Sequence, residues 1–311
     1  MKKYAVLLMA LLLLGMVAGC GQQEAKKDLQ PLNIGLMPDT DSLPFIIAQE
    51  KGYFKEEGLE VNIQQYKSAM DRDSALQSGN LDGAISDMLA VAFAKDGGFN
   101  VKVTSFTDGS YKLIASAQST AKSMADLKGQ DVAVSRNTII EYVTDQILQK
   151  ENLGEDTINK VIIPQIPTRL EMLQNGKLGA ATLPEPMASI AVHNGCKFIT
   201  GSDELGINPG VIMFTAKTTN DRRAELAAMY RAYNKAVDYL NNTPREEYID
   251  MIIEKAGFPP AAKEALKLPE YHHAALPKES DVVDCVKWLQ HKGLIKKNYT
   301  YADFVVDVLS K

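Results

Sequence analysis

The chain of 311 residues has few of the side chains that build metal centres and nucleophilic sites. It contains 3 cysteines and 4 histidines, and the histidines are scattered along the chain. Because a metal site needs several converging ligands, we expect neither a metal nor another cofactor. The sequence also lacks a G-x-S-x-G elbow, a G-x-G-x-x-G turn after a strand and a Walker loop, which argues against the enzyme classes that use them.

A surplus of positive charge is missing as well. The chain has 34 basic and 39 acidic side chains, so its formal net charge is −5, which disfavours nucleic acid as a partner. With 45% hydrophobic and 23% charged residues, the composition is that of a folded globular protein rather than a disordered or fibrous one.

One long hydrophobic run is present, at residues 5–17, directly after Lys2, Lys3 and a tyrosine. This run is shorter than the roughly 20 apolar residues of a membrane-spanning helix, and it predicts a signal peptide over residues 1–19. The sequence V-A-G-C at residues 17–20 resembles the lipobox of bacterial lipoproteins, in which the cysteine, here Cys20, receives a diacylglycerol.

Processing at Cys20 implies an extracytoplasmic protein held on a bacterial membrane by its lipid anchor. Residues 20–30 then form a lipid-bearing tether, and loss of Lys2 and Lys3 changes the charge from −5 to −7. This location permits disulfides. We nevertheless expect Cys196 and Cys285 to remain two separate buried thiols, because they fall in different lobes of the two-lobed fold predicted below.

From residue 32 onward, short apolar runs alternate with helical patterns, which predicts an α/β fold. We predict strands at 32–36, 59–64, 82–86, 101–106, 131–135, 160–164 and 180–183. Helices are predicted between them at 42–51, 69–77, 88–95, 138–150 and 168–174. A tail of helices follows at 221–241, from Pro244 to Gly257, at 280–292 and at 301–309.

The pattern repeats within the chain. A-L-Q-S-G-N-L at residues 75–81 matches M-L-Q-N-G-K-L at residues 172–178, and in each a glycine can end a helix before a strand. The order of the predicted elements restarts at the same offset. We therefore predict two similar α/β lobes.

Polar side chains gather where the predicted strands end, which is where open α/β sheets bind ligands. Many of these residue types also cap helices, and we predict this role for Ser42 and Thr138. The candidate ligand-binding residues are Asp39, Thr40, Asp41, Ser42, Ser86, Asp87, Thr107, Asp108, Tyr111, Ser135, Arg136, Asn137, Thr138 and Glu185.

These candidates give two opposing signals about the charge of the ligand. Residues 135–138 enter a helix beside Arg136, as in an anion site. The more numerous carboxylates suit an amine, an amidine-like heterocycle or a zwitterion, with Tyr111, Tyr142 or Phe45 stacking on an apolar ring. We favour the second alternative.

Residues 48–61 carry a motif that resembles a known family. The motif A-x-x-x-G-[YL]-F-x-x-x-G-L-x-V is typical of the nitrate, sulfonate, taurine and thiamine-precursor solute-binding lipoproteins, and this chain matches it from Ala48 to Val61. The segments L-Q-S-G-N-L-D-G-A-I-S at 76–86 and L-K-G-Q-D-V-A-V at 127–134 agree with it.

The resemblance implies a type II periplasmic-binding-protein fold, with a mixed sheet in each lobe and two hinge crossings. Residues 31–110 and 214–311 would form lobe 1, and residues 111–213 lobe 2. It also implies a monomer, not an enzyme, that closes on a small molecule and docks on the permease and ATPase of an importer.

The chain departs from sulfonate binders at residues 135–138 and 183–186, which favours an amine-bearing or heterocyclic metabolite such as a thiamine precursor. The alternatives are an alkanesulfonate, taurine or nitrate binder, and an enzyme of thiamine-pyrimidine or menaquinone synthesis on the same fold.

The anchor can be tested directly. In cells fed an alkyne-tagged fatty acid, the full-length chain should become labelled, and Cys20→Ser should abolish the label because it removes the acylated thiol. Cys196→Ser is the matched control and should retain the label. An unlabelled wild-type chain in the cytoplasm would contradict the prediction.

Overall fold

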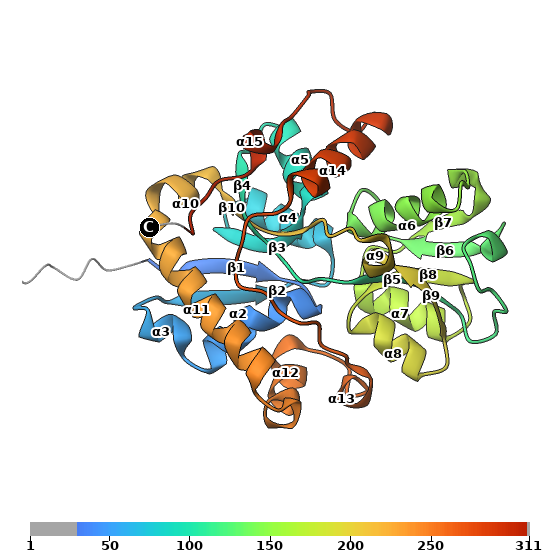
Figure 1. The fold of residues 1–311 in the computed structure, drawn as a ribbon, viewed down its shortest axis with the longest axis horizontal. Coiled ribbons are helices and arrows are strands. Elements are labelled where there is room, and N and C mark those ends of the chain that lie inside the picture. Colours follow the sequence, from blue (N-terminus) through green and yellow to red (C-terminus); the bar gives the residue numbers. More distant parts are fainter. Residues whose placement is uncertain (1–29, 310–311) are drawn as a thin grey trace, which may run out of the picture. The chain divides into compact units, whose positions relative to one another are not determined.

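The computed structural model describes residues 30–309, so the predicted signal peptide, Cys20 and nearly all of the tether lie outside the described residues. Two five-stranded sheets form its framework (Figure 1). The order of the first is β2-β1-β3-β10-β4, and that of the second is β7-β6-β8-β5-β9. The predicted two-lobed α/β fold is confirmed. We call the first sheet with its packed helices the first lobe, and the second sheet with its packed helices the second lobe.

The two sheets have the same design. The first contains β1 (Leu32–Leu36), β2 (Val61–Gln65), β3 (Gly83–Asp87), β4 (Val101–Phe106) and β10 (Gly210–Thr215). The second contains β5 (Tyr111–Ala115), β6 (Asp131–Val134), β7 (Asn159–Ile162), β8 (Ala180–Pro184) and β9 (Lys197–Gly201). In each sheet three strands are parallel to one another, and one further strand pairs antiparallel with two neighbours. This antiparallel strand is β10 in the first sheet and β5 in the second.

Helices cover both faces of each sheet. In the first lobe these are α2 (Leu43–Glu50), α3 (Tyr53–Glu56), α4 (Ala69–Gln77), α5 (Met88–Asp96), α10 (Ala216–Asp221), α11 (Arg223–Asn242), α12 (Ile249–Ala256), α13 (Ala262–Ala265), α14 (Glu279–His291) and α15 (Tyr301–Phe304). In the second lobe they are α6 (Ile139–Lys150), α7 (Ile166–Gln174), α8 (Met187–His193) and α9 (Ser202–Leu205). Short 3-10 turns lie at Thr40–Ser42, Ala125–Leu127, Glu155–Thr157 and Arg245–Glu247.

Alternation along the central strands divides the core between two layers. On β10, Ile212 and Phe214 pack with α2 and α11, whereas Val211 and Met213 pack with α5 and α14. Successive strand residues point to opposite faces, so an apolar run without polar interruption identifies a strand that is buried on both sides.

The structure corrects the expected secondary structure in several places. The resemblance implies hinge crossings near residues 110–115 and 211–215, but residues 111–115 form β5 and residues 210–215 form β10. The sheets are linked instead by residues 107–110 and 202–209. The helix expected at 301–309 ends at Phe304, because Val305 and the residues after it extend beside β4, where β-branched side chains are favoured. The helix expected to start at Pro244 begins at Ile249, after a 3-10 turn.

Two other expectations are confirmed. The repeat places α4 and β3 at a constant offset of 97 residues from α7 and β8, and Gly79 and Gly176 both have positive φ angles after their helices. Cys196 and Cys285 are buried free thiols.

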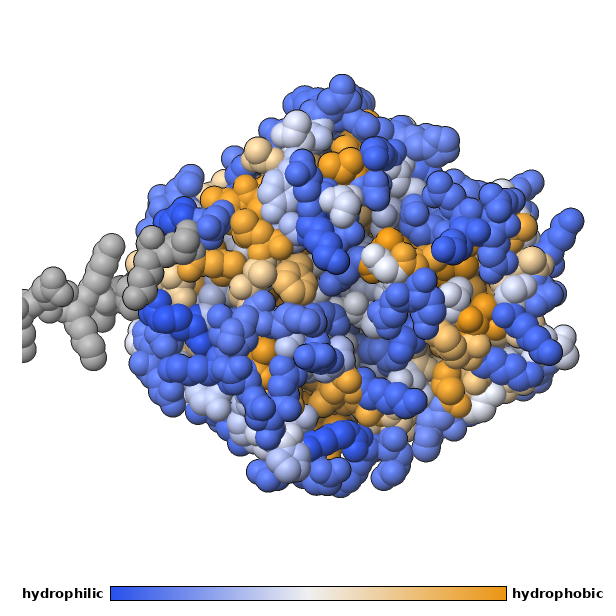
Figure 2. Space-filling model, in the orientation of Figure 1, coloured by the Kyte–Doolittle hydropathy of each residue, from blue (hydrophilic) through white to orange (hydrophobic). Residues whose placement is uncertain are grey.

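The surface visible in Figure 2 is mainly hydrophilic, with hydrophobic side chains in smaller areas between polar ones. Between Gln30 and Leu309, none of the helices has the length and apolar character needed to cross a membrane.

Gly83 tests the close packing of the central strands β3 and β10. A Cβ atom there would overlap the ring of Phe214 and lie 2.6 Å from the carbonyl oxygen of Met213. We expect Gly83→Ala to lower the free energy of unfolding by about 1–3 kcal/mol in urea titrations, as overpacking does. Gly97→Ala, at the end of a helix, should change it by less than about 0.5 kcal/mol. Equal losses in both variants would contradict the packing argument.

Candidate functional site

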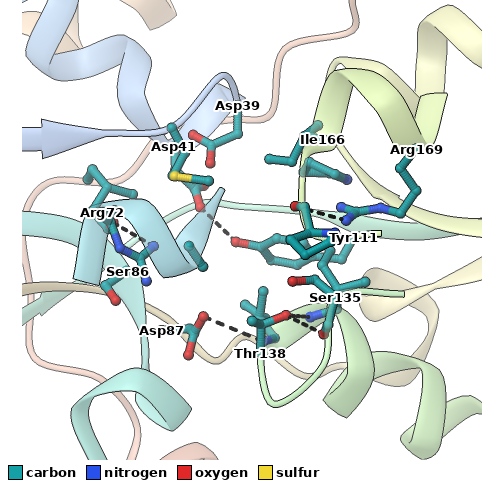
Figure 3. Close-up of a pocket in the computed structure, with 17 residues that line it drawn as sticks. Asp39, Asp41, Arg72, Ser86, Asp87, Tyr111, Ser135, Thr138, Ile166 and Arg169 are labelled. Carbon is teal, nitrogen blue, oxygen red and sulfur yellow. Dashed lines mark hydrogen bonds between the residues drawn. The ribbon is translucent and has the colours of Figure 1, made fainter. Parts of the chain in front are cut away.

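A cavity lies between the two lobes, at the carboxyl ends of the parallel strands (Figure 3). About 460 Å³ of unfilled space, part of it continuous with solvent, lies among the lining side chains, and the centre of a water molecule can reach about 40 Å³ of it. The cavity is therefore narrow. Its lining comprises Met37, Asp39, Asp41, Ala69, Arg72, Ile85, Ser86, Asp87, Tyr111, Ser135, Thr138, Ile139, Ile140, Pro164, Ile166, Arg169 and Pro184.

Half of the fourteen sequence candidates line this cavity. The first lobe contributes Asp39 and Asp41 after β1, and Ser86 and Asp87 at the end of β3; the second contributes Tyr111, Ser135 and Thr138. Thr138 also caps α6, as predicted, since its hydroxyl accepts from the backbone N–H of Ile140.

The other seven candidates are absent from the lining. Ser42 does not cap α2; its hydroxyl donates to the carbonyl of Met37 and contacts Asp39 instead. Glu185 pairs with Lys112 at 2.5 Å and accepts from the Ser189 hydroxyl at 2.9 Å. The remaining members of this group are Thr40, Thr107, Asp108, Arg136 and Asn137.

Arg136 and Asp108 differ most from their expected environments. The side chain of Arg136 is exposed on the loop before α6. Asp108 accepts from the backbone N–H of His272 at 2.9 Å and contacts its ring nitrogen Nδ1 at 2.7 Å. The two aromatic rings expected to stack on a ligand are also elsewhere, since Phe45 packs on Tyr233 and Tyr142 packs on Trp288.

Three buried carboxylates form the acidic side of the cavity. Burial raises the pKa of Asp39 to about 6, although both the N–H and the hydroxyl of Ser42 donate to it. Burial, followed by the nearby charge of Asp39, raises the pKa of Asp41 well above its usual range. Burial also raises the pKa of Asp87, against the effect of Arg72. A cationic group between these side chains would favour their charged forms.

Two arginines that the sequence analysis missed also line the cavity. Arg72 in α4 and Arg169 in α7 are 3% and 0% exposed. The candidates predicted from the sequence lie in loops after strands, whereas these two side chains come from helices. The repeat could have revealed them, because Arg72 and Arg169 lie three residues before its matched segments, at the same offset of 97.

Three lining residues each present a buried polar atom that has neither a hydrogen-bond partner nor an ion pair within residues 30–309. These atoms are Oδ1 of Asp41, Oγ of Ser86 and Nη2 of Arg169. Buried polar atoms are normally paired, so unmet groups around one cavity indicate what an occupant supplies. In the described part of the chain, no cluster of three or more His, Cys, Asp or Glu side chains could hold a metal ion.

The lobes are in contact around the cavity. The Tyr111 hydroxyl donates to Oδ2 of Asp41 at 2.9 Å, and the backbone N–H of Ile139 donates to Oδ2 of Asp87 at 3.4 Å (Figure 3). The N–H of Thr40 donates to the carbonyl of Glu185 at 3.0 Å. Each of these bonds joins a residue of the first lobe to one of the second.

A second contact between the lobes involves α14. The indole N–H of Trp288 donates to Oδ2 of Asp145 in α6 at 3.2 Å, and its ring packs edge-on against Tyr142 at 5.7 Å. Nζ of Lys292 lies 3.0 Å from the same Asp145 oxygen and 2.5 Å from Glu155. Because α14 also packs on α5, this helix connects the lobes when they are together.

The two mixed sheets with a ligand-sized space between them define the type II periplasmic binding fold. Residues 39–247 match the family model described as NMT1/THI5 like, and the chain belongs to this family. The predicted relationship to the solute-binding family is confirmed.

Solved structures show the same fold. The alkanesulfonate-binding protein SsuA from Xanthomonas axonopodis pv. citri, bound to MOPS, superposes with a TM-score of 0.75 at 16% identity, over 89% of this chain and 98% of that one. The periplasmic aliphatic sulphonate-binding protein SsuA from Escherichia coli gives 0.75 at 16% identity, over 90% and 92%. This is the solute-binding fold of ABC importers.

A shorter match connects the chain to enzymes. Two 4-amino-5-hydroxymethyl-2-methylpyrimidine phosphate synthases of Saccharomyces cerevisiae, THI11 and THI13, are 36% identical to it over 64 residues. The match covers 21% of this chain and 19% of the length of each enzyme.

The buried carboxyl of Asp39 predicts a specific pH dependence of stability. Its pKa of about 6 in the folded protein exceeds the ordinary value of 3.8, so folding favours its protonated form. The contribution of Asp39 to the free energy of unfolding is therefore full below about pH 4. It is lost as the pH rises through about 6, which lowers the free energy of unfolding by up to about 3 kcal/mol.

Asp39→Asn keeps an oxygen acceptor for Ser42 and removes the titration. Urea unfolding at pH 4 to 7 should show a smaller loss of stability with rising pH in this variant than in the wild type. The exposed Asp131→Asn should behave as the wild type does. Parallel curves for the wild type and Asp39→Asn would contradict a raised pKa at Asp39.

Proposed function

We propose that this chain is the extracytoplasmic solute-binding component of an ABC importer and captures a small organic solute by closure of its two lobes. The observation that carries the proposal is the cavity lined from both lobes, where Asp41, Ser86 and Arg169 each have an unpaired buried polar atom. A ligand that pairs with groups from both lobes stabilises the closed state over the open one.

The acidic side of the cavity favours an amine-bearing or heterocyclic metabolite, such as a thiamine precursor. Asp39, Asp41 and Asp87 can accept from an ammonium, amidine or amino group, and the ring of Tyr111 offers an apolar surface beside them. The name of the yeast relatives, which are pyrimidine phosphate synthases, agrees with an aminopyrimidine.

A sulfonate, taurine or nitrate ligand is the alternative within the same fold, since two structural neighbours are named as sulfonate-binding proteins. The start of α6 is poorly suited to such an anion. The N–H of Ile139 already donates to Asp87, that of Ile140 to Thr138, and that of Asn137 to Glu141 at 2.7 Å. Three nearby carboxylates would also repel it.

An enzyme on this fold is the other alternative, and the match to the yeast synthases is the observation that favours it. The two functions differ in where the protein works and in what it does to its ligand.

We propose that Cys20 anchors the chain to the membrane, that the protein acts as a monomer without catalysis, and that its partners are the permease and ATPase subunits of the importer.

Closure can be followed through Trp288, the only tryptophan of the sequence. Purified protein should be unfolded and refolded to release bound molecules, and a small-molecule extract of bacterial cells then added. Closure would bury the indole at its contact with Asp145, so we expect a shift of the emission to shorter wavelength and a smaller radius of gyration by X-ray scattering.

Asp87→Asn should need about tenfold more extract for the same response, because it removes a charged acceptor from the cavity wall. Glu185→Gln, whose side chain is tied to Lys112 and Ser189, is the control and should respond as the wild type does. If neither emission nor scattering changes with the extract, the binding-protein function is wrong. A chemical change of the bound molecule, seen by mass spectrometry, would favour the enzyme instead.

A further inference from the structure

The two cavity arginines are equivalent positions of the internal repeat. Arg72 in α4 and Arg169 in α7 are separated by the same 97 residues as the helices that contain them. Nη1 of Arg72 donates to the carbonyl of Ile85 at 3.1 Å, and Nε of Arg169 donates to the carbonyl of Thr182, the equivalent residue, at 3.0 Å. The two lobes therefore hold a guanidinium group in the same place by the same backbone contact.

The surroundings of these two arginines differ in charge. Nη2 of Arg72 lies 2.8 Å from Asp73, and the charge of Asp87 also acts on it. At the positions equivalent to these two carboxylates, the second lobe has Leu170 and Pro184. The symmetric scaffold thus supplies counter-ions to one guanidinium and apolar side chains to the other.

Arg169 consequently has a buried charge without a carboxylate to balance it. Nε and Nη1 donate only to backbone carbonyls, those of Thr182, Ile163 and Pro164. Burial lowers the pKa of this arginine to about 9, and no neighbouring acid opposes the shift. An unpaired buried charge is costly, and it persists in proteins where another group compensates it.

The free end of this guanidinium faces the cavity. Among the described residues, Nη2 of Arg169 has no hydrogen-bond partner although the side chain is 0% exposed. In Figure 3 the group points from α7 toward the ring of Tyr111, with Asp41 and Asp87 on the far side of the ring. The guanidinium of Arg169 and the carboxylates of Asp41 and Asp87 thus lie at opposite ends of one narrow space.

We propose that the ligand is a small zwitterion, with a cationic donor group bound by Asp39, Asp41 and Asp87 and a single carboxylate bound by Nη2 of Arg169. This inference rests on the proposed binding function and narrows its ligand, among amine-bearing metabolites, to those that also carry a carboxylate. The ligand carboxylate would supply to Arg169 the counter-ion that Asp73 and Asp87 supply to Arg72.

The number of free donors favours a carboxylate over a larger anion. Nη2 has two N–H groups, whereas the first N–H groups of α6 are already used by Asp87 and Thr138. A phosphate or sulfonate has three terminal oxygens and would leave most of them unpaired in a space this narrow. A neutral ring acceptor would leave the charge of Arg169 unbalanced.

The test uses the refolded wild-type protein and a small-molecule extract of bacterial cells, separated by ion exchange. One fraction holds compounds retained only by a cation exchanger, one holds those retained only by an anion exchanger, and a third holds those retained by a cation exchanger at pH 2 and an anion exchanger at pH 10. We expect the third fraction, which contains the zwitterions, to raise the melting temperature and shift the emission of Trp288.

A response to the cation-only or anion-only fraction instead would overturn the zwitterion and leave the binding function standing. If the protein responds neither to any of the fractions nor to the unfractionated extract, both the zwitterion and the binding function are wrong. The active compound, purified from its fraction and identified by mass spectrometry, is then titrated against the variants.

Arg169→Gln should weaken that compound about 10- to 100-fold, the effect of losing one charge-assisted hydrogen bond in a buried site. Arg136→Gln, which changes the exposed arginine on the loop before α6, should leave the affinity unchanged. Arg169→Lys keeps the positive charge and should therefore bind the active compound more tightly than Arg169→Gln does. It is the variant to titrate if Arg169→Gln does not fold.

A purely structural role of Arg169 would weaken all compounds alike. The proposal predicts a change of selectivity instead: in Arg169→Gln, the methyl ester of the active compound, which has no negative charge, should bind as well as the compound itself. An unchanged preference for the free acid in that variant would contradict the assignment.

Discussion

Five charged side chains enclose one narrow space in this protein, and the need to balance them constrains everything around it. Asp39, Asp41 and Asp87 lie on one side with Arg72, and Arg169 lies on the other. Each is almost fully removed from water, where an unpaired charge is expensive. The hydroxyl of Tyr111, the backbone amides at the starts of α5 and α6, and the carbonyls around Arg169 all serve to make this arrangement tolerable. The unpaired polar atoms that remain around this space are Oδ1 of Asp41, Oγ of Ser86 and Nη2 of Arg169.

Strand order explains why these charges meet. The parallel strands of both sheets point their carboxyl ends toward the same space, so residues at or just after the ends of β1, β3, β6 and β8 converge there although they are far apart in the sequence. The lobes share a scaffold, down to an arginine that binds the same carbonyl in each, but they differ in the charges placed on it. Recognition of a ligand with two unlike ends requires this difference.

The sequence predicted the lobes, most strands and seven of the seventeen residues that line the cavity, since apolar runs and the residues that follow them are local signals. It failed where the deciding contact is distant. Glu185 follows a strand as Asp87 does, yet Lys112 from the neighbouring strand β5 holds it away from the cavity. Arg136 is placed beside a helix start but points to solvent, whereas Arg169 within α7 is buried. β5 and β10 were missed because their pairing depends on the antiparallel insertion of chain from elsewhere, and the tail after Phe304 extends because β4 offers it an edge.

The position of β10 also has a consequence for the order in which the chain folds. It pairs with β3 and β4, more than one hundred residues earlier, and all strands of the second sheet lie between them in the sequence. A chain that is synthesised from its N-terminus can complete the second sheet first, because the strands of that sheet lie close together in the sequence. The first sheet stays split, with β3 and β4 unjoined, until β10 arrives, and such distant pairings form slowly. The acidic half of the site is therefore assembled around a lobe that already exists, and the edges of β3 and β4 need protection during that interval.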